Sequence, residues 1–485
     1  MRVFQVLFCL VFLGACAPAA EPETPVDISS ARLALGLETS EVLTWQGLEE
    51  TEDRLVFTEL RLFQDDAVLS AQTARFDGVT MIDDRASFEQ MTLENAQIDY
   101  ADGSAEIARF VLTGPQAGLI DQFTALVSGA DPESVTDVDT GFDALDLGGL
   151  TLSTENEEDG ATSFYIDGLA LSGFDGTQIE TGQLDGLRLT QDSTLSLSVA
   201  QLSFSDLPVS DPSDAGLEPS ARGVFDLMTG TNQPQSLSVD GLEGETAGLG
   251  FQIETFESTR TREADGLVTL SQSLPRMTLS ARASDTNGFA DTLSRLGYEA
   301  FEFSYDYNVR LNEARDQLVS NGENALRLTD GFTLSWHQDL VGAQAYSQAY
   351  AEFLAGDGAL GQMPPASVLE NLTIAALRVE LEDQSLITRV IDDMAAQQGA
   401  SQDEIRAQAR LMLGLGMTFL ANDWPGDMGP QTFAAINGLL SEGGSIVFEI
   451  APDAPVNGAV FASGASADDL VEAGASIRHE PPATP

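Results

Sequence analysis

Strict alternation of apolar and polar residues is the clearest pattern in this chain. In FEFSYDYNVRL, residues 301–311, aromatic or aliphatic residues occupy every second position, and Glu, Ser, Asp, Asn and Arg occupy the positions between them. Successive side chains of a strand point to opposite faces of a sheet, so this pattern predicts a strand with one buried face. Similar alternation recurs over residues 31–283, which we expect to form a β-rich, repeat-like domain.

Asp-Gly phrases punctuate the alternating segments. They precede apolar residues at Asp77, Asp167, Asp185 and Asp330, among other places. Asp-Gly supplies the positive φ angles that tight hairpin turns need. Each phrase is therefore interpreted as a turn followed by a strand.

One segment allows a prediction of strand register. In NAQIDYADGSAEIARFVL, residues 95–112, a two-residue turn at Asp102 and Gly103 would join two alternating runs. This turn would place Ile98 opposite Ile107, with both side chains on the same face.

Two β architectures compete for this region. Gly149, Gly168 and Gly186 are nineteen and eighteen residues apart, a spacing that would suit the coils of a parallel β-solenoid. The spacing does not persist, and hairpin-type turn residues recur throughout. We therefore expect an extended antiparallel β-meander, either as a curved sheet or as stacked sandwiches.

From residue 284 the apolar period changes to that of helices mixed with strands. Gly297 suits a helix C-cap, Tyr346 and Tyr350 lie at helical spacing, and Ser401 with Glu404 forms a capping box. We expect an α+β domain over residues 284–480 and a short tail over residues 481–485. The fold class is thus mainly β with an α+β C-terminal part.

The N-terminus has the pattern of an export signal. In MRVFQVLFCLVFLGAC, Arg2 precedes an apolar stretch that ends before small residues and Cys16. This stretch is well short of the ~20 apolar residues that span a bilayer. Ordinary cleavage after Ala17 or Ala20 is an alternative, because small residues also precede those positions.

The segment Leu13-Gly14-Ala15-Cys16 resembles the lipobox of bacterial lipoproteins. The resemblance implies that residues 1–15 are a signal peptide, that Cys16 is lipidated, and that residues 16–30 are a lipid anchor and tether. Ala17 after the cysteine implies sorting to the outer membrane, and we expect an outer-membrane lipoprotein that faces the periplasm. Cys9 would be removed with the signal, so no disulfide is expected.

Composition excludes several classes of function. The chain has 22 arginines, no lysine, 77 acidic residues and a formal net charge of −55. Nucleic acids bind through clusters of Lys and Arg, so no nucleic-acid partner is expected. Without lysine, Schiff-base chemistry and a phosphate-binding P-loop are impossible, and we expect no cofactor.

Few residues are candidates for chemistry. His337 lies at a polar position of the alternating segment FTLSWHQDL, and His479 lies in a Pro-flanked tail, so neither is expected to be catalytic. The acidic segment 137–149, with Asp137, Asp139, Asp143 and Asp146, fails the calcium-loop pattern at three positions. We therefore expect no metal site.

The turn and L-x-L phrases over residues 55–335 resemble those of AsmA-like bacterial envelope proteins. That resemblance implies a long curved β-sheet with an apolar inner surface and a role in envelope lipid handling. The lipobox and the helical C-terminal part differ from that group, and no motif residue can be carried over.

These observations predict a non-enzymatic, lipid-anchored protein of the cell envelope. Its membrane contact would be the lipid anchor, and its extended sheet would bind either a partner protein or lipid acyl chains. A surface adhesin or assembly factor is one alternative. A hydrolase that uses paired carboxylates is another, because such a pair needs no sequence signature.

Overall fold

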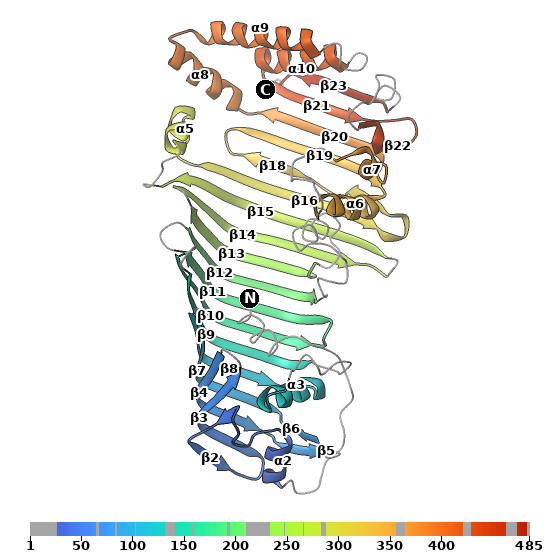
Figure 1. The fold of residues 1–485 in the computed structure, drawn as a ribbon. Coiled ribbons are helices and arrows are strands. Elements are labelled where there is room, and N and C mark those ends of the chain that lie inside the picture. The colour runs from blue at the N-terminus through green and yellow to red at the C-terminus, as the bar shows by residue number, and fades with distance from the viewer. Residues whose placement is uncertain are drawn as a thin grey trace. The chain divides into compact units, whose positions relative to one another are not determined.

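The structure is a computed structural model that describes most of the chain (Figure 1). The described residues are 27–64, 67–82, 85–101, 103–130, 141–156, 160–191, 195–209, 233–246, 248–264, 266–282, 288–355, 364–420, 428–461 and 473–482. They divide into two compact units. Unit 1 comprises Met1–Ser210 with Pro234–Thr246, and unit 2 comprises Asp211–Gln233 with Ala247–Pro485.

Unit 1 is an antiparallel meander whose strands pair mostly with their neighbours in sequence. Two short strands pair with β3, and the order then runs β3, β4, β7, β8, β9, β10, β11, β12, β13. The strands are β1 (Leu43–Thr44), β2 (Gly47–Glu50), β3 (Arg54–Gln64), β4 (Ala67–Asp77), β7 (Gln90–Tyr100), β8 (Gly103–Thr113), β9 (Phe142–Asn156), β10 (Gly160–Phe174), β11 (Gln178–Gln191), β12 (Leu195–Pro208) and β13 (Ser236–Thr246). β5 (Thr80–Ile82) and β6 (Arg85–Ser87) form a separate two-stranded sheet.

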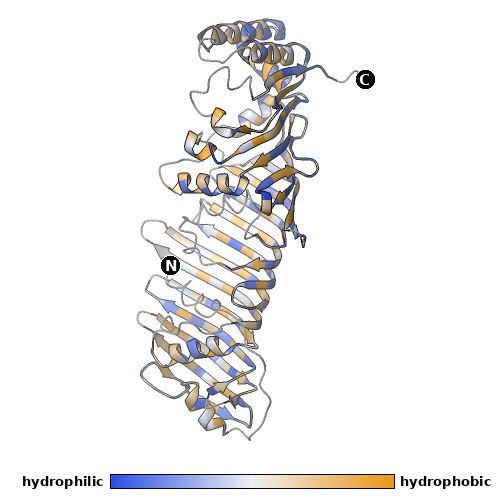
Figure 2. Ribbon diagram, turned by 90° about the vertical axis from the view of Figure 1, so that its right-hand side faces the viewer, coloured by the Kyte–Doolittle hydropathy of each residue, from blue (hydrophilic) through white to orange (hydrophobic). Residues whose placement is uncertain are grey.

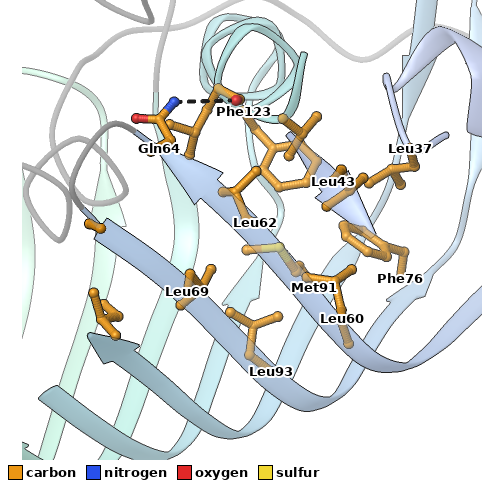
Figure 3. Close-up of a pocket in the computed structure, with 15 residues that line it drawn as sticks. Leu37, Leu43, Leu60, Leu62, Gln64, Leu69, Phe76, Met91, Leu93 and Phe123 are labelled. Atoms are coloured by element: carbon orange, nitrogen blue, oxygen red, sulfur yellow. Dashed lines mark hydrogen bonds between the residues drawn. The ribbon is translucent and has the colours of Figure 1, made fainter. Parts of the chain in front are cut away.

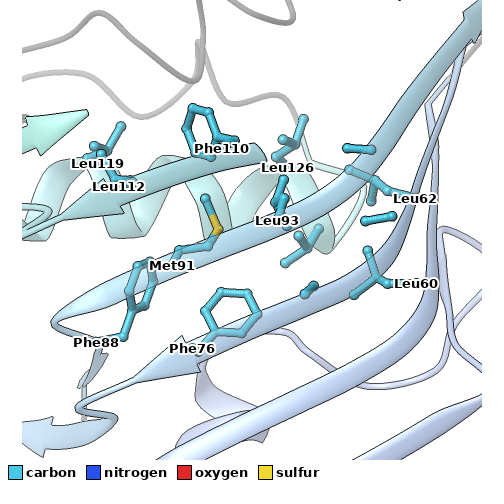
Figure 4. Close-up of a cluster of buried hydrophobic side chains, with 14 of the residues drawn as sticks. Leu60, Leu62, Phe76, Phe88, Met91, Leu93, Phe110, Leu112, Leu119 and Leu126 are labelled. Carbon is cyan, nitrogen blue, oxygen red and sulfur yellow. The ribbon is translucent and has the colours of Figure 1, made fainter. Parts of the chain in front are cut away.

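Two described helices accompany the sheet of unit 1, α2 (Ile28–Ala34) and α3 (Ala117–Val127). α3 packs on the apolar face of the sheet, where the ring of Phe123 lies 5.7 Å from that of Phe76 and 6.0 Å from that of Phe88. Figure 4 shows the buried apolar side chains that gather between α3 and the strands. The prediction for residues 31–283 included no helix, so α3 was missed.

Unit 2 is also an antiparallel meander, but it carries more helices. Its strands are β14 (Leu249–Arg262), β15 (Leu267–Ala281), β16 (Phe301–Asn312), β17 (Gln317–Ser320), β18 (Ala325–Leu328), β19 (Phe332–Val341), β20 (Thr373–Asp383), β21 (Gly444–Ile450), β22 (Val456–Asn457) and β23 (Ala475–Glu480). Its helices are α5 (Phe289–Leu296), α6 (Ala343–Ala355), α7 (Ala366–Leu369), α8 (Leu386–Gln398), α9 (Gln402–Leu420) and α10 (Met428–Glu442), with 3-10 turns η3 (Glu313–Arg315) and η4 (Gly458–Phe461).

Local signals for the helices of unit 2 are confirmed. Gly297 caps α5 in the left-handed conformation with a φ of 72°. At the start of α9, the N–H of Ser401 donates to Glu404 Oε2 over 2.8 Å, and the N–H of Glu404 donates to Ser401 Oγ over 3.3 Å. This reciprocal pair is the predicted capping box.

The predicted fold class is confirmed as mainly β with an α+β C-terminal part. Every pairing described above is antiparallel, so the alternative parallel solenoid is wrong. Apart from β5 and β6, the strands of each unit belong to one meandering sheet instead of a stack of sandwiches. The predicted domain boundary at residues 283 and 284 stays a prediction. The two compact units divide elsewhere, because β14 and β15 belong to unit 2.

Two of the recurring Asp-Gly phrases lie inside strands, whereas Asp330-Gly331 forms the predicted turn before β19. Asp167-Gly168 is in the middle of β10, and Asp185-Gly186 is in the middle of β11. The interpretation of these two phrases as hairpin turns is therefore wrong. They belong to a line of positions that crosses the sheet, which we call the first seam. It contains Glu59, Gln72, Asn95, Ala108, Gly149, Asp167, Gly186, Ala200 and Gly241.

Every second strand has a left-handed residue at the first seam. The φ angle is 51° at Glu59, 49° at Asn95, 62° at Gly149, 63° at Gly186 and 60° at Gly241. The seam interrupts the two-residue alternation, so that buried residues on its two sides, such as Phe57 and Leu60, are three positions apart. Like a β-bulge, this break keeps the apolar residues on one face while the strand bends.

A second seam crosses the strands six residues from the first. Its left-handed residues lie in or directly after the other strands, with φ angles of 65° at Gly78, 59° at Gly114, 64° at Gly173 and 49° at Asp206. The two seams thus alternate from strand to strand. Because of the two seams, the apolar residues of nine strands lie opposite one another on one face of the sheet.

Candidate functional site

Between the hairpin ends and the second seam, one face of the unit 1 sheet is apolar across nine strands. Its residues form four rows, in which each residue lies opposite the next on the neighbouring strand. The first row contains Leu62, Leu69, Ile98, Ala105, Leu152, Phe164, Leu189, Leu197 and Gly244. The second row contains Leu60, Ala71, Ala96, Ile107, Leu150, Ile166, Leu187, Val199 and Leu242.

Two further rows lie on the other side of the first seam. The third row contains Phe57, Ala74, Leu93, Phe110, Leu147, Leu169, Leu184, Leu202 and Val239. The fourth row contains Leu55, Phe76, Met91, Leu112, Leu145, Leu171, Gly182, Phe204 and Leu237. None of these positions carries a polar side chain. At ~4.8 Å per strand, the rows extend over roughly 38 Å.

Burial divides this apolar face into two parts. On β3, β4, β7, β8 and β9 the row residues are buried except for Leu69 and Leu152, and we call this the covered face. On β10–β13 most row residues are partly exposed, and we call this the open face. Figure 2 shows hydrophobic residues recurring along neighbouring strands. Residues of the described helices α2 and α3 pack against the covered face. This part of the sheet is therefore the core of unit 1.

A small cavity remains within the covered face (Figure 3). It has a volume of about 50 Å³ and lies between α3 and the strands, beside Leu62, Leu69 and Phe123. Gln64 is the one polar residue of its lining, and Gln64 Nε2 donates to the carbonyl oxygen of Leu126 over 3.4 Å. The cavity is too small for a lipid chain, so the open face is the candidate site.

The opposite face of the same strands is polar and acidic. Tyr165 Oη donates to Asp167 Oδ1 over 2.8 Å, and Arg188 Nη2 lies 3.1 Å from Asp167 Oδ2. The guanidinium of Arg188 also stacks 4.7 Å from the ring centre of Tyr165. The hydrogen bond to the Asp167 carboxylate, with its charge, raises the pKa of Tyr165.

A second cavity, of about 260 Å³, lies on the polar face of β2, β3, β4 and β7. Glu49 and Glu94 line it together with Arg54, Arg75 and three threonines. The cavity contains neither histidine nor cysteine, and each glutamate is exposed to solvent. This arrangement gives no support to a desolvated pair of carboxylates of the kind that a hydrolase would use.

The sequence-predicted candidates do not converge. Cys16, Asp137 and Asp139 lie outside the described residues, while Asp143 and Asp146 are exposed on β9. Within the described parts of the chain, no group of His, Cys, Asp and Glu side chains could hold a metal ion.

The two histidines have different environments. His337 is exposed on β19, as predicted. The expectation that His479 lies in a tail is wrong, because it is in β23, where its Nε2 donates to the carbonyl oxygen of Gly443 over 2.6 Å. The expectation failed because the prolines that follow His479 begin only after the strand has ended at Glu480. This bond anchors β23 beside the end of α10.

Comparison with known proteins gives no function. A family model described as "Uncharacterized protein" matches residues 325–478, which run from β18 into β23 of unit 2. No curated protein matches the chain. Among the described helices, none is long and apolar enough to cross a membrane.

Proposed function

We propose that this protein is a non-enzymatic, lipid-anchored component of the bacterial cell envelope whose open face binds lipid acyl chains. The observation that carries the proposal is the set of four uninterrupted apolar rows. On β10–β13 these rows are partly exposed, and no described helix of unit 1 packs on them as α3 packs on the covered face.

The chemistry of the open face favours acyl chains over a protein partner. Protein interfaces form about one hydrogen bond per 100–200 Å² and mix polar with apolar groups. The row residues of the open face offer no polar side chain, and their backbone groups are used in the sheet. An acyl chain needs no hydrogen bonds and gains ~0.8 kcal/mol per buried CH₂ group.

The size of the open face suits a chain from one membrane leaflet. Four strands at ~4.8 Å spacing cover about 14 Å from β10 to β13. Half of a ~30 Å hydrocarbon core is about 15 Å. A chain that runs across the strands along one row would therefore fit within the open face.

Crosslinking of a photoactivatable fatty acid tests this proposal. The full chain with Cys16→Ser is used, so that an anchor cannot supply the bound lipid. We expect label on peptides from β10–β13. Leu189→Glu, in the first row, should abolish labelling, whereas Thr190→Glu, the next residue on the polar face, should preserve it. Label spread evenly over both faces, or none in a folded protein, would contradict the proposal.

The proposed anchor at Cys16 has its own test. Two or three acyl chains hold a protein firmly on a membrane, whereas one holds it only marginally. We expect the mature N-terminal peptide to carry a diacylglyceryl mass at Cys16, and Cys16→Ser to release the protein from washed outer membranes. Undiminished retention of the variant would refute lipid anchoring without touching the acyl-binding proposal.

A further inference from the structure

The open face is bordered by a polar rim that carries no charge. One step beyond the first row, on the same face, lie Thr154, Thr162, Gln191, Leu195 and Thr246 in register. We call the four polar members the polar rim. Among the described residues of β9–β13, every position on the apolar face and on its rim is uncharged. Hydroxyl and amide groups are therefore the polar contacts that this side offers to a ligand.

The polar face of the same five strands has the opposite character. Its described side chains include one guanidinium, that of Arg188, which already pairs with Asp167. The carboxylates on this face are those of Asp143, Asp146, Asp167, Glu180, Asp185, Asp206, Asp240, Glu243 and Glu245, of which the last three, on β13, make further interactions. The six carboxylates on β9–β12 outnumber the one cation and give the sheet a negative field.

This field reaches the polar rim. Two packed sheet layers are ~10 Å apart, so one sheet is thinner than the Debye length of ~10 Å at 0.1 M salt. An anionic group at the rim would be repelled, and Arg188, the one arginine among the described residues of these strands, already pairs with Asp167 on the opposite face. An uncharged or zwitterionic group would be bound by the hydroxyls without that penalty.

We infer that the open face selects lipids whose head groups carry no net negative charge. The inference rests on the proposed function and names its ligand class. The acyl chains would lie along the rows on β10–β13, and the head group would contact the polar rim at the ends of the β9–β10 and β11–β12 hairpins. Hydroxyl-bearing neutral lipids and zwitterionic phospholipids both have this chemistry.

A competition experiment tests the selection. The full chain with Cys16→Ser is incubated with vesicles that contain equal amounts of diacylglycerol, phosphatidylethanolamine, phosphatidylglycerol and cardiolipin. The protein is then separated from the vesicles, and its bound lipids are quantified by mass spectrometry. At 0.01 M NaCl we expect the first two lipids to exceed the two anionic lipids by about tenfold. At 1 M NaCl, where the Debye length is ~3 Å, the ratio should fall toward one.

A pair of variants places the selection at the rim. Thr162→Arg adds a cation to the polar rim, and Ser163→Arg adds the same charge to the polar face one residue away. We expect Thr162→Arg to raise the share of anionic lipid severalfold more than Ser163→Arg does.

The outcomes separate this inference from the proposed function. Bound lipid that is unselected, or enriched in anionic species, would overturn the selection while leaving acyl binding intact. Equal effects of the two arginine variants would also overturn the assignment to the rim. A folded protein that carries no lipid from any vesicle would refute the proposed function itself.

Discussion

The covered and open faces of unit 1 carry the same kinds of residue in the same four rows, yet they differ in what lies over them. On the covered face, α3 brings Phe123 against Phe76 and Phe88, and the rows become a core. On the open face, rows of equal apolarity remain partly exposed on β10–β13. Apolar patterning alone therefore does not separate a core from a binding surface, and the covering element decides between them.

The largest expected effect tests this comparison with one residue type in one row. Leu147 on β9 is 4% exposed, whereas Leu184 on β11 is half-buried, and both belong to the third row. Leu147→Ala should cost about 2–5 kcal/mol of unfolding free energy because it leaves a cavity in a packed core. Leu184→Ala should cost about 1 kcal/mol because less area is buried and solvent fills the gap.

Urea unfolding of both variants measures the difference. If Leu184→Ala weakens acyl-chain labelling while Leu147→Ala mainly lowers stability, the division into a binding part and a core part is sharpened. Equal losses of stability would show that something covers both faces alike, which would break the comparison.

The first seam crosses both the covered face and the open face. A substitution at this seam has the second-largest expected effect on stability. Gly186 has a φ of 63°, and a Cβ atom there would lie 1.8 Å from Asp167 Oδ2. Gly186→Ala should cost about 1–2 kcal/mol from the left-handed backbone alone, and displacement of the Asp167 carboxylate adds to it. Gly168→Ala is the matched control on β10, because its nearest neighbour would be 3.9 Å away. Equal melting temperatures for the two variants would contradict the role of the seam.

The first seam also explains why the prediction of hairpin turns at Asp167-Gly168 and Asp185-Gly186 is wrong. Asp-Gly between alternating runs is a strong hairpin signal, and Ile166 and Leu169 flank Asp167-Gly168 as residues flank a two-residue turn. In the structure Ile166 pairs instead with Leu150 of β9. The spacing of eighteen or nineteen residues that suited a solenoid is the length of one strand plus one hairpin turn.

The predicted register of the two strands in residues 95–112 is wrong for a related reason. Ile98 was expected opposite Ile107, but it pairs with Ala105, and Tyr100 pairs with Gly103. A shift of two residues keeps every side chain on its face, so the apolar pattern cannot detect it. Only the position of the turn, one residue earlier than predicted, fixes the true register.

What the sequence predicted well depends on short-range chemistry. Strand β16, the capping box at Ser401 and the C-cap at Gly297 each depend on residues within a few positions of one another. The open face depends on pairings between strands that are distant in sequence, and on the absence of a covering helix among the described residues of unit 1. An inner apolar surface was expected from a resemblance, but which strands leave it exposed was not predictable.

A smaller effect of opposite sign is expected where the seam crosses the covered face. Glu59 on β3 occupies a left-handed position with a φ of 51°, which is unfavourable for a residue with a side chain. Glu59→Gly should stabilise the protein by about 0.5–1 kcal/mol, because relief of this strain exceeds the entropy cost of glycine. Thr58→Gly, at the adjacent exposed position, should destabilise it. Thermal unfolding compares the two, and a loss of stability in Glu59→Gly would show that its side chain makes contacts worth more than the strain.

The smallest effect concerns the turn between β10 and β11, two strands that carry the open face. Burial of the Asp175 carboxyl opposes its ionisation, but the N–H groups of Thr177 and Gln178 donate to Asp175 Oδ1, each over 2.8 Å, and the pKa of Asp175 is lowered from its usual value. A lowered pKa means that the carboxylate stabilises the fold at neutral pH, and that this contribution fades as pH falls below about 4 through the folded-state value. Asp175→Asn retains an acceptor oxygen without the charge, so its melting temperature should lie slightly below that of the wild type at pH 7. Because the group is partly exposed and screened, the gap should be smaller than those of the variants above. It should narrow as the pH falls below about 4, and a gap that stayed constant between pH 7 and pH 3 would show that the turn is held by shape and not by charge.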